Sequence, residues 1–87
     1  MIAGAKYKRL QSHDDQRGWL AELVRSDDPH LDRFGQVYMS VTYPGVVKAW
    51  HLHQRQIDLI TCVSGAILLV LHDLRDESDT YGQTDEH

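Results

Sequence analysis

The sequence predicts an all-β chain that runs as an antiparallel meander, and three observations lead to this prediction. Residues 19–25 place their side chains alternately on two faces, in the manner of a half-buried strand. Residues 34–43 are rich in β-branched and aromatic side chains, which favour extended backbone. No segment shows a helical apolar period of any length.

The N-terminal third is expected to hold two strands separated by a turn. Residues 6–10 fit a short edge strand, and residues 13–18 fit a turn that ends in glycine. The strand over residues 19–25 follows. Residues 26–33 are polar and include Pro29, so they are expected to form a loop.

Four further strands are expected, over residues 34–43, 46–53, 57–63 and 66–74. Pro44 and Gly45 supply standard turn chemistry between the first two of these strands. Ser64 and Gly65 are expected to form a tight hairpin turn between the last two. Residues 75–87 are polar and are expected to end the chain without another strand.

The composition bounds the class of protein. The 87 residues are 41% hydrophobic with a net charge of -4, which fits one small domain of marginal stability. The single cysteine, Cys62, is expected to be buried in a reducing compartment. No secretory signal or membrane span and no basic stripe is found, so we expect a cytoplasmic protein that binds neither membrane nor nucleic acid.

Two histidines give the strongest candidate site. His51 and His53 stand two residues apart, so both imidazoles would point to the same face of a strand. Asp58 opens the next apolar run, which could return antiparallel and bring a carboxylate to the same interior. The spacing of these residues between Gly45 and Gly65 resembles the first signature motif of the cupin superfamily of small β-barrels.

The same three side chains, His51, His53 and Asp58, also make a plausible two-histidine, one-carboxylate set for a divalent ion such as iron, manganese or zinc. A metal-dependent cupin is therefore an alternative function.

Asp73 ends an otherwise apolar row on one face of the last expected strand. Burying an unpaired charge is costly, so this carboxylate is expected to have a partner. Two interpretations stay open: Asp73 caps the following turn, or it lies near His51. Arg75 is expected to pair with Asp73 or with a neighbouring acid.

Longer stretches of the chain resemble the dTDP-4-dehydrorhamnose 3,5-epimerase family of the cupins. The resemblance runs from about Asp15 to Gln83 and rests on DQRGWLAEL, on FGQVYMSVTYPGVVKAWH, and on CVSG followed by HDLRDESDTYGQ. It implies an isomerase of carbohydrate biosynthesis that epimerises a dTDP-linked 4-keto-6-deoxyhexose. It also implies that the enzyme works without a metal or other cofactor.

The resemblance implies roles for individual residues. His51 matches the general base that deprotonates the carbons flanking the keto group, and Asp73 is the candidate carboxylate to orient its ring. Arg17 matches an arginine that meets the diphosphate, often across a dimer interface. Gln36 and Ser40 match positions that line the sugar-nucleotide pocket.

Four positions depart from the family pattern. Lys48 stands where the family has arginine, and Ala49 replaces a glycine. His53 replaces a tyrosine, and Asp58 replaces the lysine that would steady the enolate oxygen. A carboxylate there opposes a growing negative charge unless it is protonated or turned away. Lys48 and His53 remain in the expected substrate-binding set, and a different keto-sugar isomerisation stays open.

The resemblance also bears on assembly. It implies a single cupin-type, jelly-roll domain over residues 1–87 that lacks the C-terminal side of the family's barrel and its general-acid tyrosine. A partial barrel exposes strand edges and an apolar face. We therefore expect an antiparallel β-barrel or partial barrel completed by dimerisation, as a homodimer with exchanged strands. A non-catalytic sugar-nucleotide-binding dimer module is the third hypothesis.

Overall fold

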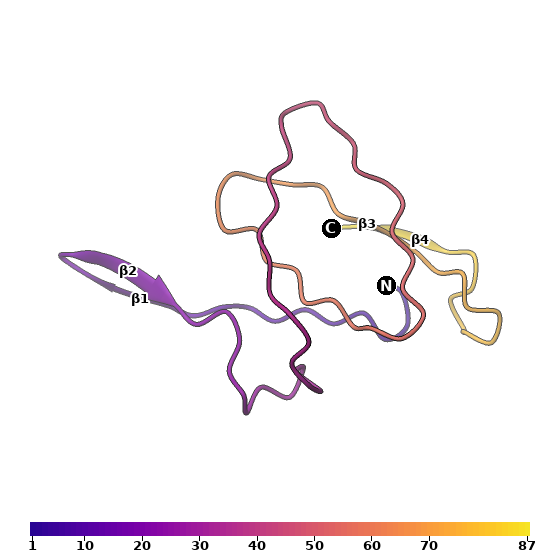
Figure 1. The fold of residues 1–87 in the computed structure, drawn as a ribbon, viewed down its shortest axis with the longest axis horizontal. Helices are drawn as coiled ribbons and strands as arrows, with labels where there is room; N and C mark the ends of the chain where they lie inside the picture. The colour runs from indigo at the N-terminus through magenta and orange to yellow at the C-terminus, as the bar shows by residue number, and fades with distance from the viewer.

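Regular structure in the computed structural model, which describes all residues from 1 to 87, is confined to two small antiparallel sheets (Figure 1). β1 (Ser12–Asp15) pairs with β2 (Gly18–Ala21), and β3 (Val70–His72) pairs with β4 (Thr84–Glu86). No helix is present. The all-β prediction is therefore confirmed at the level of fold class, whereas a closed barrel is not formed by this chain.

The first sheet is a hairpin that projects from the rest of the molecule (Figure 1). Asp15 faces Gly18 in the register, so the turn holds only Gln16 and Arg17 and is shorter than the expected turn over residues 13–18. β2 ends at Ala21 because its ladder partner begins at Ser12, so the expected strand over residues 19–25 is too long. The expected edge strand over residues 6–10 has no partner strand and does not form.

The second sheet corrects the expectation for the C-terminal residues. β3 lies inside the expected strand over residues 66–74, but β4 forms in the polar stretch where no strand was expected. Leu69 and His87 extend the ladder by exchanging N–H···O bonds of 2.9 and 2.8 Å. Backbone pairing across the 73–83 connection sets this strand, so a search for apolar alternation misses it.

The segment from Phe34 to Leu68 consists of long stretches without regular secondary structure that are joined by turns and bends (Figure 1). We call the stretches over residues 34–43, 46–53 and 57–63 limbs. The turn at Pro44-Gly45 is confirmed: the Val46 N–H donates to the Tyr43 carbonyl at 3.1 Å, and Gly45 has φ of 78°. The chain also bends at Ser64-Gly65, but no hairpin ladder follows. The strands expected over residues 34–43, 46–53 and 57–63 are absent, because none of these limbs forms a ladder of backbone hydrogen bonds with a neighbour.

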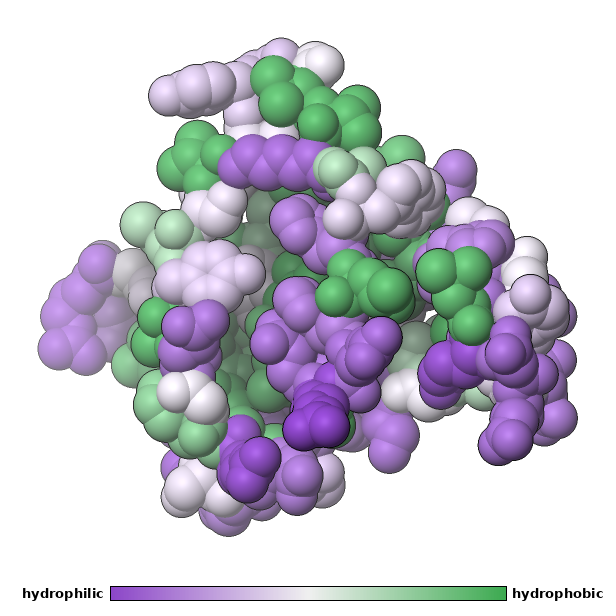
Figure 2. Space-filling model, turned by 45° about the vertical axis from the view of Figure 1, so that its right-hand side comes forward, coloured by the Kyte–Doolittle hydropathy of each residue, from purple (hydrophilic) through white to green (hydrophobic).

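The molecule is open and exposes most of its apolar side chains. Ile2 is the single buried hydrophobic residue, and the other buried residues are Asp28 and Asp73. The radius of gyration is 15.3 Å, whereas a compact domain of this length has about 12 Å. Green hydrophobic side chains stand at the surface among purple polar ones (Figure 2). The expected burial of Cys62 is wrong, because no core forms around its run.

Candidate functional site

His51 lies on the limb that descends from the Pro44-Gly45 turn, and its side chain is exposed. Its side chain takes part in no hydrogen bond or ion pair within the chain. The preceding residue, Trp50, places its ring centroid 6.5 Å from that of His72 on β3, at an interplanar angle of 58°. This tilted aromatic contact links the His51 limb to the second sheet.

His53 and Asp58 lie on either side of the bend at residues 54–55. The Asp58 Oδ2 atom is 3.2 Å from His53 Nε2, and the Gln56 amide nitrogen donates to Asp58 Oδ1 at 2.9 Å. Both oxygens of the carboxylate are therefore engaged. The two paired side chains remain partly open, at 36% and 42% exposed.

The metal-binding alternative finds only part of its expected ligand set. His53 and Asp58 meet, but His51 does not join them, and no group of three His, Cys, Asp or Glu side chains is close enough to hold an ion.

Lys48 and Ser40 are two expected substrate-binding residues that the structure brings together. The Lys48 ammonium donates to Ser40 Oγ at 2.9 Å and to the Val41 carbonyl at 2.5 Å. These bonds join the two limbs on either side of the Pro44-Gly45 turn. Gln36, on the first of these limbs, is exposed and makes no polar contact.

Arg17 sits at the tip of the projecting β1–β2 hairpin (Figure 1). Its Nη2 atom donates to Asp15 Oδ2 at 2.6 Å, and its side chain is 84% exposed. The hydrogen bond from Arg17 lowers the pKa of the Asp15 carboxyl, and the same contact raises the pKa of Arg17. Arg17 has no contact with the limb that carries His51, so the two residues are held apart within one chain.

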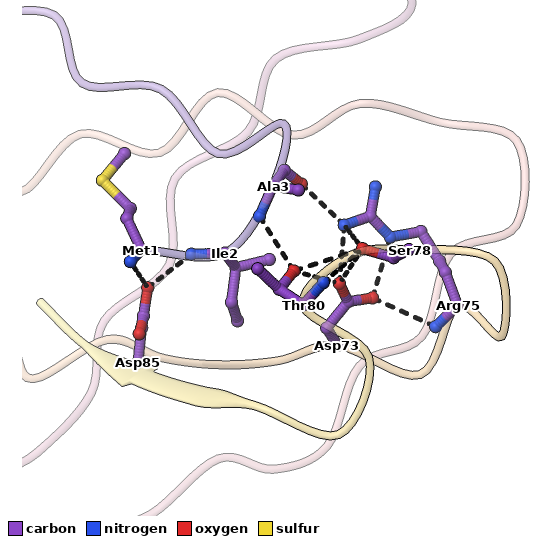
Figure 3. A network of polar contacts seen from close by, with 8 residues as sticks. All are labelled: Met1, Ile2, Ala3, Asp73, Arg75, Ser78, Thr80 and Asp85. Carbon is purple, nitrogen blue, oxygen red and sulfur yellow. Dashed lines mark hydrogen bonds and ion pairs between the residues drawn. The ribbon is translucent and has the colours of Figure 1, made fainter.

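Asp73 is buried at the start of the β3–β4 connection and has three side-chain partners (Figure 3). Arg75 donates from Nε at 2.8 Å and from Nη2 at 2.8 Å, and the hydroxyls of Ser78 and Thr80 each donate at 2.6 Å. These bonds, led by that of Arg75, hold the pKa of Asp73 far below its usual value. The structure thus shows Asp73 capping the turn and paired with Arg75. Asp73 makes no hydrogen bond or ion pair with His51.

The N-terminal residues dock onto the same connection and onto β4, which the sequence alone did not reveal. The Ile2 N–H donates to Asp85 Oδ2 at 2.6 Å, and the Ala3 N–H donates to Thr80 Oγ1 at 3.0 Å. Arg75 Nη2 in turn donates to the Ala3 carbonyl at 2.6 Å (Figure 3). A backbone group of residue 2 or 3 takes part in each of these three bonds, so side-chain patterns carry no signal for them.

A second polar cluster also escaped the sequence analysis. Asp28 is buried, pairs with Lys8, and accepts the His30 N–H at 2.9 Å. The contact with Lys8 is the main cause that lowers the pKa of Asp28. Together with Arg25, Asp27 and Pro29, these residues line a shallow cavity of about 310 Å³. Lys8 and Arg25 already pair with Asp28 and Asp27. We therefore interpret this cluster as a structural contact between the N-terminal segment and the loop after β2.

Comparison with known proteins gives one family match, over residues 1–87, to the family model described as dTDP-4-dehydrorhamnose 3,5-epimerase. No solved structure matches the chain. No helix is long and apolar enough to cross a membrane.

Three curated relatives are similar in sequence. The spore coat polysaccharide biosynthesis protein SpsL of Bacillus subtilis is 51% identical over 85 residues, which are 98% of this chain and 56% of the relative. A probable low-salt glycan biosynthesis epimerase, Agl13, of Haloferax volcanii is 42% identical over 91 residues, covering 97% of this chain and 55% of the relative. A dTDP-4-dehydrorhamnose 3,5-epimerase of Mycobacterium tuberculosis is 36% identical over 81 residues, covering 84% of this chain and 40% of the relative. The chain thus spans about half the length of the first two relatives.

Proposed function

The chain belongs to the dTDP-4-dehydrorhamnose 3,5-epimerase family, and on that premise we propose that it serves as a 3,5-epimerase-like isomerase of nucleotide-linked sugars. The proposed substrate is a dTDP-linked 4-keto-6-deoxyhexose. The observation that carries the proposal is the family match over residues 1–87, which includes His51 and the motif around it. The names of SpsL and Agl13 support a place in polysaccharide or glycan biosynthesis.

In the proposed reaction His51 is the general base. Its imidazole takes the proton from a carbon beside the 4-keto group, and the electron pair of the broken C–H bond moves onto the carbonyl oxygen to give an enolate. A proton delivered to the opposite face then restores the ketone with inverted configuration at that carbon. Imidazole suits this step because it gains and loses a proton near neutral pH. The absence of any hydrogen bond to His51 supports the role, since its acceptor nitrogen is not occupied.

The charges around the two histidines fit an anionic substrate. Asp58, which replaces a lysine of the family pattern, contacts His53 and Gln56. Its negative charge therefore faces His53 and not the proposed substrate. Lys48 is the cation nearest to His51 in sequence, and in the proposal its ammonium group binds the anionic part of the substrate. Ser40, which accepts a bond from Lys48, and Gln36 complete the proposed pocket wall.

The proposed assembly is a homodimer with exchanged strands that completes a cupin-type barrel. The accessible surface is 8543 Å², whereas a folded monomer of 10.0 kDa has about 5200 Å². The excess is roughly 3300 Å² per chain, or about 6600 Å² for two copies, which lies above the usual total area of obligate interfaces and calls for an extensive exchange of strands. Because Arg17 projects away on its hairpin, we assign it to the diphosphate in the partner's site. The role of Asp73 as the carboxylate that orients His51 likewise stays a proposal, which would need a rearrangement of its present bonds.

The test is deuterium uptake from heavy water at the carbons beside the keto group, followed by NMR. We expect uptake with the intact protein and its loss, by at least a hundredfold, in His51→Ala, because general-base catalysis contributes about 10²–10⁴-fold. His13→Ala, at an exposed position on β1, is the matched control and should keep the wild-type rate. A folded wild-type protein that shows no uptake would contradict the proposal.

Two alternatives lead to other outcomes of the same experiment. Binding of the nucleotide sugar without deuterium uptake is the result expected of a non-catalytic binding module. For the metal-dependent cupin, the structure shows two of three expected ligands together, and metal analysis of the purified protein tests it. The cytoplasmic location expected from the sequence stays a prediction.

A further inference from the structure

Two of the four positions that depart from the family pattern contact each other. His53 stands where the family has tyrosine, Asp58 stands where it has lysine, and their side chains meet at 3.2 Å between Nε2 and Oδ2. Gln56 holds the other carboxylate oxygen at 2.9 Å. Each of the two substitutions alone would remove a family feature. Together they place an imidazole beside a carboxylate.

The contact determines which ring nitrogen of His53 is free. The negative charge 3.2 Å from Nε2 favours the neutral tautomer that carries its proton on that nitrogen. Nδ1 then carries a lone pair and acts as an acceptor. No protein group occupies it, and the side chain is 36% exposed. An open acceptor suits a hydroxyl donor.

We propose that His53, held by Asp58 and Gln56, accepts a hydrogen bond from the C2 hydroxyl of the hexose and so makes the enzyme selective for 2-hydroxy sugars. This inference rests on the proposed function, with the sugar next to His51. His51 and His53 are both exposed on the same limb, and residues two apart lie at most about 7 Å apart along the backbone. The proposal places the base and the acceptor against the same sugar ring.

The choice of the C2 hydroxyl follows from the proposed chemistry. Epimerisation inverts C3 and C5, so the substituents on those two carbons change position during the reaction. C2 keeps its configuration, and its hydroxyl is adjacent to the reacting C3. A fixed acceptor such as His53 can hold that hydroxyl in the substrate, the enolate and the product. Asp58 and Gln56 act as positioning residues, because Asp58 contacts His53, Gln56 contacts Asp58, and neither is placed against the sugar.

The experiment compares two substrates, the dTDP-linked 4-keto-6-deoxyhexose and its 2-deoxy analogue, in the intact protein. Deuterium uptake and dissociation constants are measured for wild type, His53→Ala, His53→Gln, Asp58→Asn and the control Gln54→Ala. We expect the wild type to favour the 2-hydroxy sugar by about tenfold or more, since a site built to bind a hydroxyl discriminates against its absence. Gln54→Ala, next to His53 in the chain, should keep this ratio.

The ratio between the substrates is the deciding quantity. His53→Ala should bring it close to one, and Asp58→Asn should reduce it, because an amide can donate to Nε2 and move the ring proton to Nδ1. His53→Gln keeps an acceptor oxygen and should recover part of the preference. A purely structural role of His53 would lower both rates and leave the ratio unchanged, and that result would overturn the inference.

The two proposals fail in different ways. Deuterium uptake with equal rates and equal affinities for both sugars in the wild type overturns the role of His53 and leaves His51 as the base. No uptake with either sugar overturns the epimerase proposal, and the ratio of dissociation constants then still decides whether His53 binds the C2 hydroxyl.

Discussion

The Asp73 carboxylate is the clearest case of a charged residue whose surroundings explain its presence. Arg75 neutralises it, and two hydroxyls satisfy its remaining lone pairs, so the cost of burying the charge is offset. The same cluster receives the N-terminal residues through Ala3. Asp73 is therefore expected to support the ordering of both chain ends.

The low pKa of Asp73 predicts a pH-dependent contribution to stability. The folded state holds its proton less tightly than the unfolded state, whose carboxyl has a pKa of about 3.9. The contribution is thus fully present above that value and is lost gradually as the pH falls from there towards the much lower pKa of the folded state. Asp73→Asn should lower the unfolding temperature more at pH 6 than at pH 2. Thermal unfolding at both pH values checks this, with exposed Asp76→Asn as the control, which should show little effect at either.

At the scale of elements, turns in this chain depend on local backbone geometry. Gly82 has φ of 79°, and its N–H donates to the Asp73 carbonyl at 2.8 Å, closing the connection into β4. Nothing lies within 4 Å of an added Cβ, so Gly82→Ala introduces backbone strain alone. We expect a loss of about 1 kcal/mol in the free energy of unfolding, measured with denaturant. Gly35→Ala, with equal space and no positive φ, should change it little; an equal loss would contradict the backbone argument.

The same distinction explains which elements the sequence could predict. The turn at Pro44-Gly45 follows from two residues, and the structure confirms it. Strands need a partner, so β-branched composition predicts extended limbs at residues 34–43 but not whether they pair. β4 has no apolar signature and arises from pairing across a connection that Asp73 and Gly82 close.

In the candidate site, too, the sequence could predict some contacts and not others. The spacing of His53 and Asp58 indicated that they could meet, and they do. The contact between Lys48 and Ser40 crosses a turn, and spacing in a regular strand would have placed Lys48 on the face opposite His51. The N-terminal docking at Asp85 depends on backbone N–H groups, which carry no residue-specific signal.

At the scale of the whole molecule, the exposed limbs are difficult to reconcile with a stable isolated monomer. Val37 is 84% exposed, Met39 81% and Val47 85%. Each buried apolar side chain would contribute about 1.5–3 kcal/mol, and within one copy Ile2 is the only hydrophobic residue that is buried. We therefore expect association to supply much of the missing burial.

This argument predicts that a charge on a limb weakens association. In the proposed homodimer Val37 becomes covered, and burying a lysine ammonium there without a partner is costly. Val37→Lys should raise the dissociation constant of the assembly at least tenfold in sedimentation velocity across a range of concentrations. Ser26→Lys adds the same charge in an exposed polar turn and should leave association unchanged. If both variants and the wild type remain monomeric, or all associate equally, the limb around Val37 is not the interface, and the proposed exchange of strands must involve another part of the chain.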